Sequence, residues 1–257
     1  MISTPAQLRA EIRTGNWTSP TAGVLGGYQQ ANFVALPQEN AFDFLLFCIR
    51  NPQVCPVIDV SEPGVPLVQL DSGAADVRTD IPRYRVWQDG ELVAEPLDVN
   101  AYWTDDLVGF LLGCSHTFEG PVAEAGFTMH ENPGSPAPPV YITNRNVVPA
   151  GKIAGRLAVS MRSFPAGEVA GVVQVTSRYP TGHGAPVHIG DPGGLGIRDL
   201  RSPDFGPKPN VLEGEVPMFW ACGVTPQLVL PDLRMHTLIT HYPGHMMVLD
   251  NKPVARL

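Results

Sequence analysis

Residues 181–192 read TGHGAPVHIGDP and place two histidines and an aspartate among closely spaced glycines and prolines. Histidine titrates near neutral pH, so His183 and His188 are candidates for a base that removes a proton from a substrate. Asp191 could fix the tautomer of an imidazole, but its position before Pro192 is also typical of a helix N-cap. For His188 the alternative is a core histidine on a strand.

Two corners of the sequence carry cysteine. Residues 219–226 read FWACGVTP, so Cys222 lies where a predicted strand meets Gly223 and a helix start at Thr225. Backbone N–H groups there would lower a thiol pKa, bind a carboxylate or form an oxyanion hole. In LLGCSHTFE, residues 111–119, Cys114 is a second candidate acid–base thiol, and Ser115 is either a helix cap or a substrate contact. A small buried residue at a tight turn is the alternative for Cys222, and Cys114 could also be a nucleophile.

The segment THYPGHMM adds His241 and His245, which would share one face of a helix and imitate a metal-binding pair. Pro243 and Gly244 lie between them and disfavour a helix, so we predict no metal site. His241 is instead a candidate acid. The predicted substrate contacts are residues with hydrogen-bonding groups or a flexible backbone at these corners, together with arginines able to clamp a carboxylate: Ser115, Gly223, Thr225, His245, Arg78, Arg145 and Arg162.

Short elements joined by specific turns must position these groups, because the chain holds 26 glycines and 27 prolines. In the first half we expect a strand at 33–36, a hairpin of 84–87 with 92–94 across Asp89-Gly90, and helices at 5–14, 40–51, 104–112 and from 115. In the second half strands at 157–161, 187–189, 216–221, 238–241 and 246–249 alternate with helices at 166–178 and after Thr225-Pro226.

This alternation predicts an α/β fold, with a mixed, partly parallel sheet flanked by helices and a smaller α+β subdomain. We expect one module over 1–257, with a main lobe of 1–140 plus 205–257 and a smaller lobe of 141–204. Residues 131–139, ENPGSPAPP, read as an extended linker or exposed loop. In open α/β sheets, ligands bind at the carboxyl ends of strands. We therefore expect the site to form where four segments meet, which we call the four corners: 113–115, 181–191, 220–226 and 240–245.

Composition narrows the function classes. The net charge of −8, without long charge runs, disfavours a nucleic-acid partner, and no apolar run reaches the roughly 20 residues that span a bilayer. The N-terminus lacks the apolar core of a signal peptide, so a cytoplasmic protein is expected. The four cysteines form no C-x-x-C pair, and no G-x-S-x-G elbow, phosphate-binding loop or dinucleotide fingerprint occurs, so no cofactor is predicted.

Seven segments together resemble one known family: PTAGVLGGYQQANFVALP, AFDFLLFCIRNPQVCPVIDV, DVRTDIPRYRV, LLGCSHTFE, HGAPVHIGDP, EVPMFWACGVTP and ITHYPGHMMVLD. They are similar to the YcsI-like proteins named "putative hydro-lyases", a module that also occurs in D-glutamate cyclase proteins. The likeness runs from about residue 5 to residue 250. It implies an α/β fold of two subdomains and a carbon–oxygen lyase that acts on a small carboxylic or amino acid. Cyclase activity carries over less directly, because the cyclase proteins contain a further domain.

A hydro-lyase needs a base, an acid and a cationic clamp. Our hypothesis takes His183 or His188 as base, and Cys222, Cys114 or His241 as acid, with the carboxylate held by Arg145 and Arg162. For cyclisation of D-glutamate to 5-oxoproline, the base would instead deprotonate the α-amine. The alternatives are a non-catalytic module that binds a small acid and a metal-dependent hydrolase. The sequence leaves the oligomeric state open, a homo-oligomer included.

Overall fold

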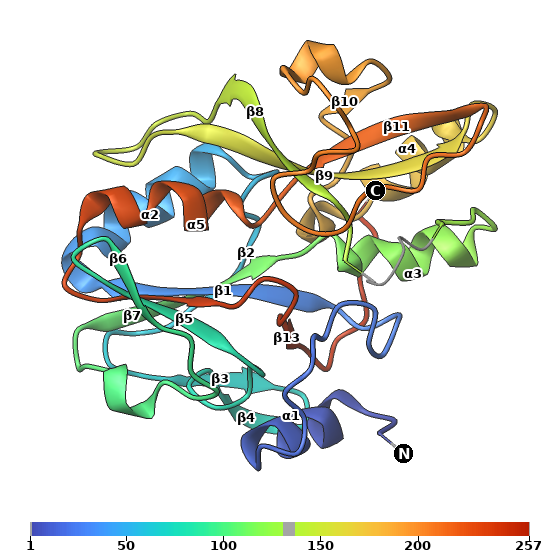
Figure 1. Cartoon of the computed structure of the whole chain (residues 1–257). Coiled ribbons are helices and arrows are strands. Elements are labelled where there is room, and N and C mark those ends of the chain that lie inside the picture. The colour runs from blue at the N-terminus through green and yellow to red at the C-terminus, as the bar shows by residue number, and fades with distance from the viewer. Residues whose placement is uncertain (1, 131–136, 257) are drawn as a thin grey trace.

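A computed structural model describes residues 2–130 and 137–256. Two stacked sheets form the body of the molecule (Figure 1). The larger sheet has the strand order β2-β7-β1-β12-β5-β6, with β13 also paired to β1. Its strands are β1 (Gln30–Pro37), β2 (Val57–Val60), β5 (Tyr84–Gln88), β6 (Glu91–Ala94), β7 (Leu107–Gly113), β12 (Leu238–His241) and β13 (Met247–Val248).

The smaller sheet has the order β10-β11-β9-β8, and a separate hairpin, β3-β4, packs beside the larger one. These strands are β8 (Val140–Asn146), β9 (Arg156–Pro165), β10 (His188–Ile189), β11 (Glu215–Ala221), β3 (Leu67–Leu70) and β4 (Gly73–Asp76). The helices are α1 (Pro5–Arg13), α2 (Gln38–Arg50), α3 (His116–Glu124), α4 (Val169–Ser177) and α5 (Thr225–Val229), with short 3-10 turns η1 (Asn100–Tyr102), η2 (Pro180–Gly182), η3 (Pro192–Leu195) and η4 (Pro231–Leu233).

The prediction of a partly parallel sheet was wrong, because every strand pair in the described residues is antiparallel. Strands and helices do alternate, but no helix returns the chain to a parallel neighbour in the same sheet. Helix α3 follows β7 of the larger sheet and precedes β8 of the smaller one, and α5 leads from β11 back to β12. The fold is therefore α+β, and the proposed lobe boundaries stay a prediction.

The predicted helix at 104–112 was also wrong, since residues 107–113 form the strand β7. Alternate side chains of β7 enter two different cores: Val108, Phe110 and Leu112 face one, and Leu107 and Leu111 face the other. A strand buried on both faces lacks a polar side, so its sequence reads as a continuous apolar run that also fits a buried helix.

The remaining expected elements lie close to their predicted ranges. The β5-β6 hairpin turns at Asp89 and Gly90, which have φ of 51° and 86°. Asp191 caps η3 by accepting the N–H of Gly193 at 2.9 Å. Residues 131–136 of the predicted linker lie outside the described residues. Within the part that the structure describes, no helix is long and apolar enough to cross a membrane.

The main core fills the space between the two sheets. Helices α2 and α5 lie between the layers (Figure 1) and contribute Phe44, Phe47 and Val229 to this core. Phe110 of the larger sheet and Phe219 of the smaller sheet meet in the same core. Helices α3 and α4 cover the other face of the smaller sheet, where Trp220 packs against Phe118 and Phe164. The two cores hold the sheets and α3 together, and the candidate site lies where strand ends of both sheets meet.

Candidate active site

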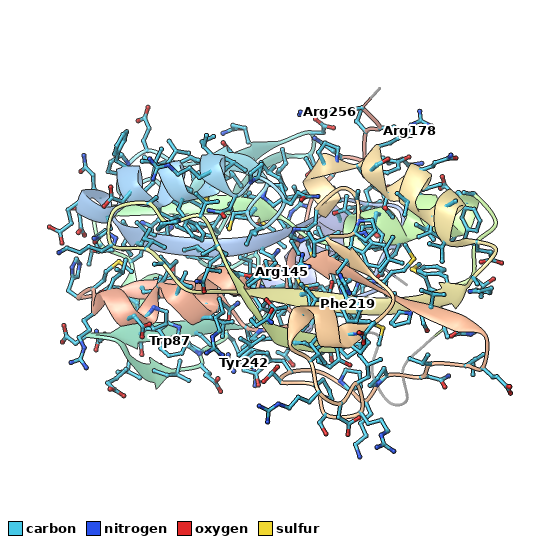
Figure 2. The ribbon with its side chains drawn as sticks, turned by 90° about the horizontal axis from the view of Figure 1, so that it is seen from above. Trp87, Arg145, Arg178, Phe219, Tyr242 and Arg256 are labelled. Atoms are coloured by element: carbon cyan, nitrogen blue, oxygen red, sulfur yellow. The ribbon has the colours of Figure 1, made fainter. Side chains whose placement is uncertain are left out.

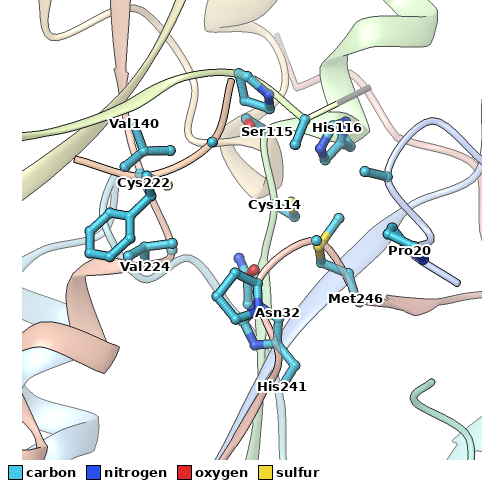
Figure 3. Close-up of a pocket in the computed structure, with 18 of the residues that line it drawn as sticks. Pro20, Asn32, Cys114, Ser115, His116, Val140, Cys222, Val224, His241 and Met246 are labelled. Atoms are coloured by element: carbon cyan, nitrogen blue, oxygen red, sulfur yellow. The ribbon is translucent and has the colours of Figure 1, made fainter. Parts of the chain in front are cut away.

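A cavity of about 270 Å³ lies between ends of the two sheets (Figure 3). Cys114 follows β7, Cys222 follows β11, His241 ends β12, and His183 follows η2. Each comes from one of the corners singled out in the sequence. The cavity therefore gathers imidazole and thiol groups from four separate stretches of the chain, and Ser115 and Gly223 also line it.

His183 is held in one orientation by its surroundings. It is 1% exposed, has a left-handed backbone with φ of 72°, and its Nδ1 lies 2.7 Å from the carbonyl oxygen of Gln53. A carbonyl only accepts, so Nδ1 carries the hydrogen and Nε2 keeps a free lone pair. Burial lowers the pKa of His183 to about 4, which makes it a neutral base at physiological pH.

His241 is equally buried, at 2% exposure. Its Nδ1 lies 3.1 Å from the backbone nitrogen of Phe33 and 3.2 Å from the Phe33 carbonyl oxygen, so either tautomer finds a partner. Burial lowers the pKa of His241 to about 4. Two neutral imidazoles from separate segments of the chain thus line the cavity.

The cavity thiols are protonated at rest. Burial raises the pKa of Cys114 to about 12, and the backbone N–H of His116 offsets this only in part. Burial also raises the pKa of Cys222, against the N–H of Val224. The sequence led us to expect a lowered thiol pKa at the Cys222 corner. Desolvation outweighs the helix-start amide there, so the shift has the opposite direction.

A charged network of His116, Glu119 and Arg162 borders the cavity at the start of α3. The sequence analysis missed His116 and Glu119. His116 lines the cavity, and its Nδ1 lies 2.7 Å from Oε2 of Glu119. Arg162 contacts the other carboxylate oxygen through Nε at 3.0 Å and through Nη2. Burial opposes ionisation of Glu119, but the charges of His116 and Arg162 lower its pKa to about 2. The signal was the H-x-x-E spacing, which places both side chains on one helix face.

Arg162 is engaged in this network and does not line the cavity. Besides Glu119, it donates to Ser160 Oγ at 3.2 Å and to Ser115 Oγ at 3.1 Å. Its charge still reaches the cavity, because it lowers the pKa of Cys114 and Cys222 against the effect of burial. Arg162, which was predicted to hold the substrate carboxylate, therefore lies behind the cavity wall, where it orients Glu119 and Ser115.

Three other predicted residues lie away from the cavity. Nε2 of His188 is 2.6 Å from the Asp191 carbonyl oxygen, and its ring lies against Phe219. Arg78 pairs with Asp76 next to the β3-β4 hairpin. Arg145 is exposed on β8, where it is labelled in Figure 2.

Thr225 and His245 support the cavity walls without lining them. Thr225 is fully buried and donates from Oγ1 to the Cys222 carbonyl at 2.8 Å. His245 donates from Nδ1 to the Pro243 carbonyl, 3.0 Å away, and burial lowers its pKa.

Asn32 of β1 is a second lining residue that the sequence analysis missed. It is 5% exposed and donates from Nδ2 to the Gly113 carbonyl at 2.6 Å. A Cβ on Gly223 would collide with the same amide, so glycine is needed where the two sheets come together. A lone asparagine in the apolar strand QANFVALP was the available signal.

A family profile described as D-glutamate cyclase matches residues 108–250. "Putative hydro-lyase YcsI" of Bacillus subtilis is 49% identical over 246 residues, which cover 96% of this chain and 96% of the relative. A "Putative hydro-lyase" of Saccharopolyspora erythraea is 52% identical, with 96% of each chain covered. The chain belongs to the D-glutamate cyclase family. The resemblance to YcsI-like proteins seen in the sequence is thereby confirmed.

The part matched by the D-glutamate cyclase profile contains most of the cavity. Cys114, His116, His183, Cys222 and His241 lie within 108–250, whereas Asn32 precedes it. A solved nitrogen repressor-like protein of Methanococcus jannaschii aligns over 96% of this chain and 99% of its own, at 8% identity and a TM-score of 0.39, too distant to bear on fold or function. In the described ranges, no three His, Cys, Asp or Glu side chains gather as metal ligands.

Proposed function

We propose that the cavity is the active site of a hydro-lyase that removes water from a small carboxylic or amino acid, with cyclisation of D-glutamate to 5-oxoproline as the first reaction to test. The observation that carries this proposal is the convergence of three histidines and two cysteines on one cavity. Both relatives carry the name "putative hydro-lyase", which supports the same reaction class.

In this proposal His183 is the base. Its Nε2 has a free lone pair, because Nδ1–H is committed to Gln53. In an elimination, Nε2 would take the proton from the carbon next to the substrate carboxylate. The electron pair left on carbon would form the double bond as the neighbouring hydroxyl departs.

His116 is the proposed acid that protonates the departing oxygen. Glu119 accepts from its Nδ1 and compensates the charge of an imidazolium, as the carboxylate does in other His–carboxylate pairs. Arg162 is then a positioning residue, because it fixes Glu119 and Ser115. Its charge, close behind the wall, would also favour an anionic substrate.

Cyclisation of D-glutamate uses the same two groups. His183 would remove a proton from the α-ammonium, and the freed amine would attack the side-chain carboxyl carbon. Nitrogen would lose two protons in all, and one side-chain carboxylate oxygen would gain two and leave as water. His116 would deliver the second of these protons to the departing oxygen. The products are 5-oxoproline and one water molecule.

The test is incubation of the purified protein with D-glutamate, L-glutamate and a panel of four- and five-carbon hydroxy acids. Mass spectrometry would detect 5-oxoproline or an unsaturated acid. We expect turnover by the wild type and a loss of at least about 100-fold in His183→Ala, the usual scale for removal of a general base. His236→Ala is the matched control, because His236 is exposed and lies outside the cavity.

Two results would contradict the proposal. One is full turnover by His183→Ala. The other is the absence of product from every acid while one of them raises the unfolding temperature, which would identify a non-catalytic binding module.

A further inference from the structure

The two corners that bring thiols to the cavity share one local construction. Residues 114–117 read CSHT and residues 222–225 read CGVT. Each set directly follows the last residue of a strand, Gly113 of β7 or Ala221 of β11. In each, the N–H of the threonine donates to the carbonyl of the cysteine three residues earlier, at 3.0 Å in both cases. We refer to them as the two Cys-x-x-Thr turns.

The threonine side chains are used in the same way. Thr117 Oγ1 accepts the backbone N–H of Gln30 in β1, at 3.2 Å. Thr225 Oγ1 accepts the backbone N–H of Ala158 in β9, at 3.1 Å. β1 is the neighbour of β7, and β9 is the neighbour of β11. Each turn is thus fastened to the adjacent strand by an equivalent bond from a buried threonine.

The sulfur atoms also have matching surroundings. The backbone N–H of His116 lowers the pKa of Cys114, and that of Val224 lowers the pKa of Cys222, two residues later in both turns and against the larger effect of burial. Charge on Cys222 raises the pKa of Cys114, so the two groups lie within electrostatic reach of each other.

The two turns face one cavity from different sheets. Cys114 belongs to the wall formed by the larger sheet and Cys222 to the wall formed by the smaller one. Figure 3 shows them on separate segments around the cavity. The other two cysteines, Cys48 and Cys55, are instead packed in the main core, as structural cysteines are.

We propose that Cys114 and Cys222 form a two-thiol pair that transfers protons to and from the α-carbon of a bound α-amino or α-hydroxy acid, and that the protein therefore inverts the configuration of such acids. One cysteine, as thiolate, removes the α-proton and becomes a thiol. The electron pair stays on the carbon and is delocalised into the carboxyl group. The other cysteine donates its thiol proton to the opposite face and becomes the thiolate.

This exchange is balanced without an oxidant or a second substrate. The product is the enantiomer of the substrate, and the pair is left with its protonation reversed, ready for the opposite direction. Burial keeps both cysteines as thiols at rest, so the cycle begins only when His183, the base that lines the same cavity, accepts the proton of one of them. The backbone N–H at each sulfur and the nearby charge of Arg162 stabilise the thiolate.

The inference rests on the proposed function only in using the same cavity as the substrate site, because it needs no loss of water. The experiment incubates the full chain in ²H₂O, with a phosphine reductant, with D- or L-glutamate and with D- or L-malate. Proton NMR follows the α-hydrogen, chiral chromatography follows the enantiomers, and mass spectrometry follows 5-oxoproline in the same samples.

We expect the wild type to incorporate α-deuterium and to form the opposite enantiomer of at least one acid. Cys114→Ala and Cys222→Ala should each lower inversion by at least about 100-fold. Each should still exchange the α-hydrogen of a single enantiomer, and the two variants should differ in which one. Cys48→Ala is the matched control. Cys114→Ser and Cys222→Ser, which keep an acceptor for the backbone N–H, serve if an alanine variant fails to fold.

The absence of α-deuterium from both enantiomers of both acids with wild type would overturn the inference, and so would wild-type inversion by either single variant. Formation of 5-oxoproline without α-exchange would leave the proposed dehydration intact and refute the two-thiol pair. Exchange and inversion without 5-oxoproline would support the pair and count against the cyclisation.

Discussion

At the scale of single residues, burial sets the protonation state of the groups in the cavity. His183 and His241 are neutral and the two cysteines are thiols, because removal from water penalises whichever form carries a charge. Glu119 keeps its charge only because His116 and Arg162 lie against it. The site therefore combines neutral groups that can exchange protons with one fixed carboxylate.

The buried histidines should make stability depend on pH. In the unfolded chain histidine has a pKa of about 6.5, whereas burial lowers the pKa of His183 and His241 to about 4. Between these values the unfolded state binds protons that the folded state does not, so this contribution is complete above pH 6.5 and is lost as pH falls. We expect the free energy of unfolding to fall by about 2 kcal/mol per histidine between pH 7 and pH 5.

Urea denaturation at pH 7, 6 and 5 measures this dependence, in a range where carboxylates remain ionised. His241→Gln should remove about half of the slope that the two histidines contribute, and exposed His236→Gln should leave the slope unchanged. If the free energy of unfolding changed with pH equally in wild type and His241→Gln, burial would not lower the pKa of His241 as described.

At the scale of elements, the cavity depends on close backbone approaches at strand ends. Gly113 ends β7 directly against η2, and a Cβ there would overlap the carbonyl oxygen of Thr181. That residue is two positions before His183 in the chain. The same strand end therefore sets the position of Cys114 and of the loop that carries His183.

Gly113→Ala should accordingly destabilise the protein by about 2–3 kcal/mol, since a backbone oxygen cannot move aside as a side chain can. Gly167→Ala is the matched control, because no atom lies within 4 Å of its added Cβ and its φ is not positive. We expect the control to change the free energy of unfolding by less than about 0.5 kcal/mol. Chemical denaturation would compare them, and equal stability of both variants would argue against the close contact.

Local sequence signals predicted elements with strong punctuation and failed where burial was two-sided. The Asp89-Gly90 hairpin and the Asp191 cap carry turn or cap chemistry that is readable from a few residues. β7 carries no polar face, so its period could not be recognised. Strand direction failed for another reason: pairing partners are set by long-range contacts that alternation along the chain does not contain.

At the scale of the whole molecule, one core joins the two sheets and keeps the cavity walls together. Phe44 of α2 is fully buried, and its ring is stacked with Phe47 and lies edge-on to Phe110. Phe44→Ala should cost about 3–5 kcal/mol, the range for deleting a buried aromatic ring. Phe42→Ala, on the same helix but 73% exposed, should cost less than about 0.5 kcal/mol.

Denaturant unfolding of both variants would measure the difference. Similar losses in the two would contradict the placement of α2 between the sheets. A decrease in activity of Phe44→Ala that follows its fraction of folded protein would show that the core acts through stability alone.

Residue chemistry along the sequence singled out four titratable residues that line the cavity, namely Cys114, His183, Cys222 and His241, and their roles stay predictions. It did not separate His183 from His188, because both lie in the same loop and only the tertiary fold turns one toward the cavity. It also missed His116, although the H-x-x-E spacing at the predicted helix start indicates a pair with Glu119 on one helix face. The arginines were least predictable, because long side chains find their partners far along the chain, as Arg162 does with Glu119.

The central strand β1 is completed on one side by β12 and β13, which lie more than 200 residues further along the chain. A ribosome must therefore release nearly all of the polypeptide before this strand acquires its second neighbour, and until then β1 exposes an open edge. Such late closure slows folding and invites pairing with other nascent chains. Expression at lower temperature, or with chaperones that shield the edge, should raise the yield of native protein.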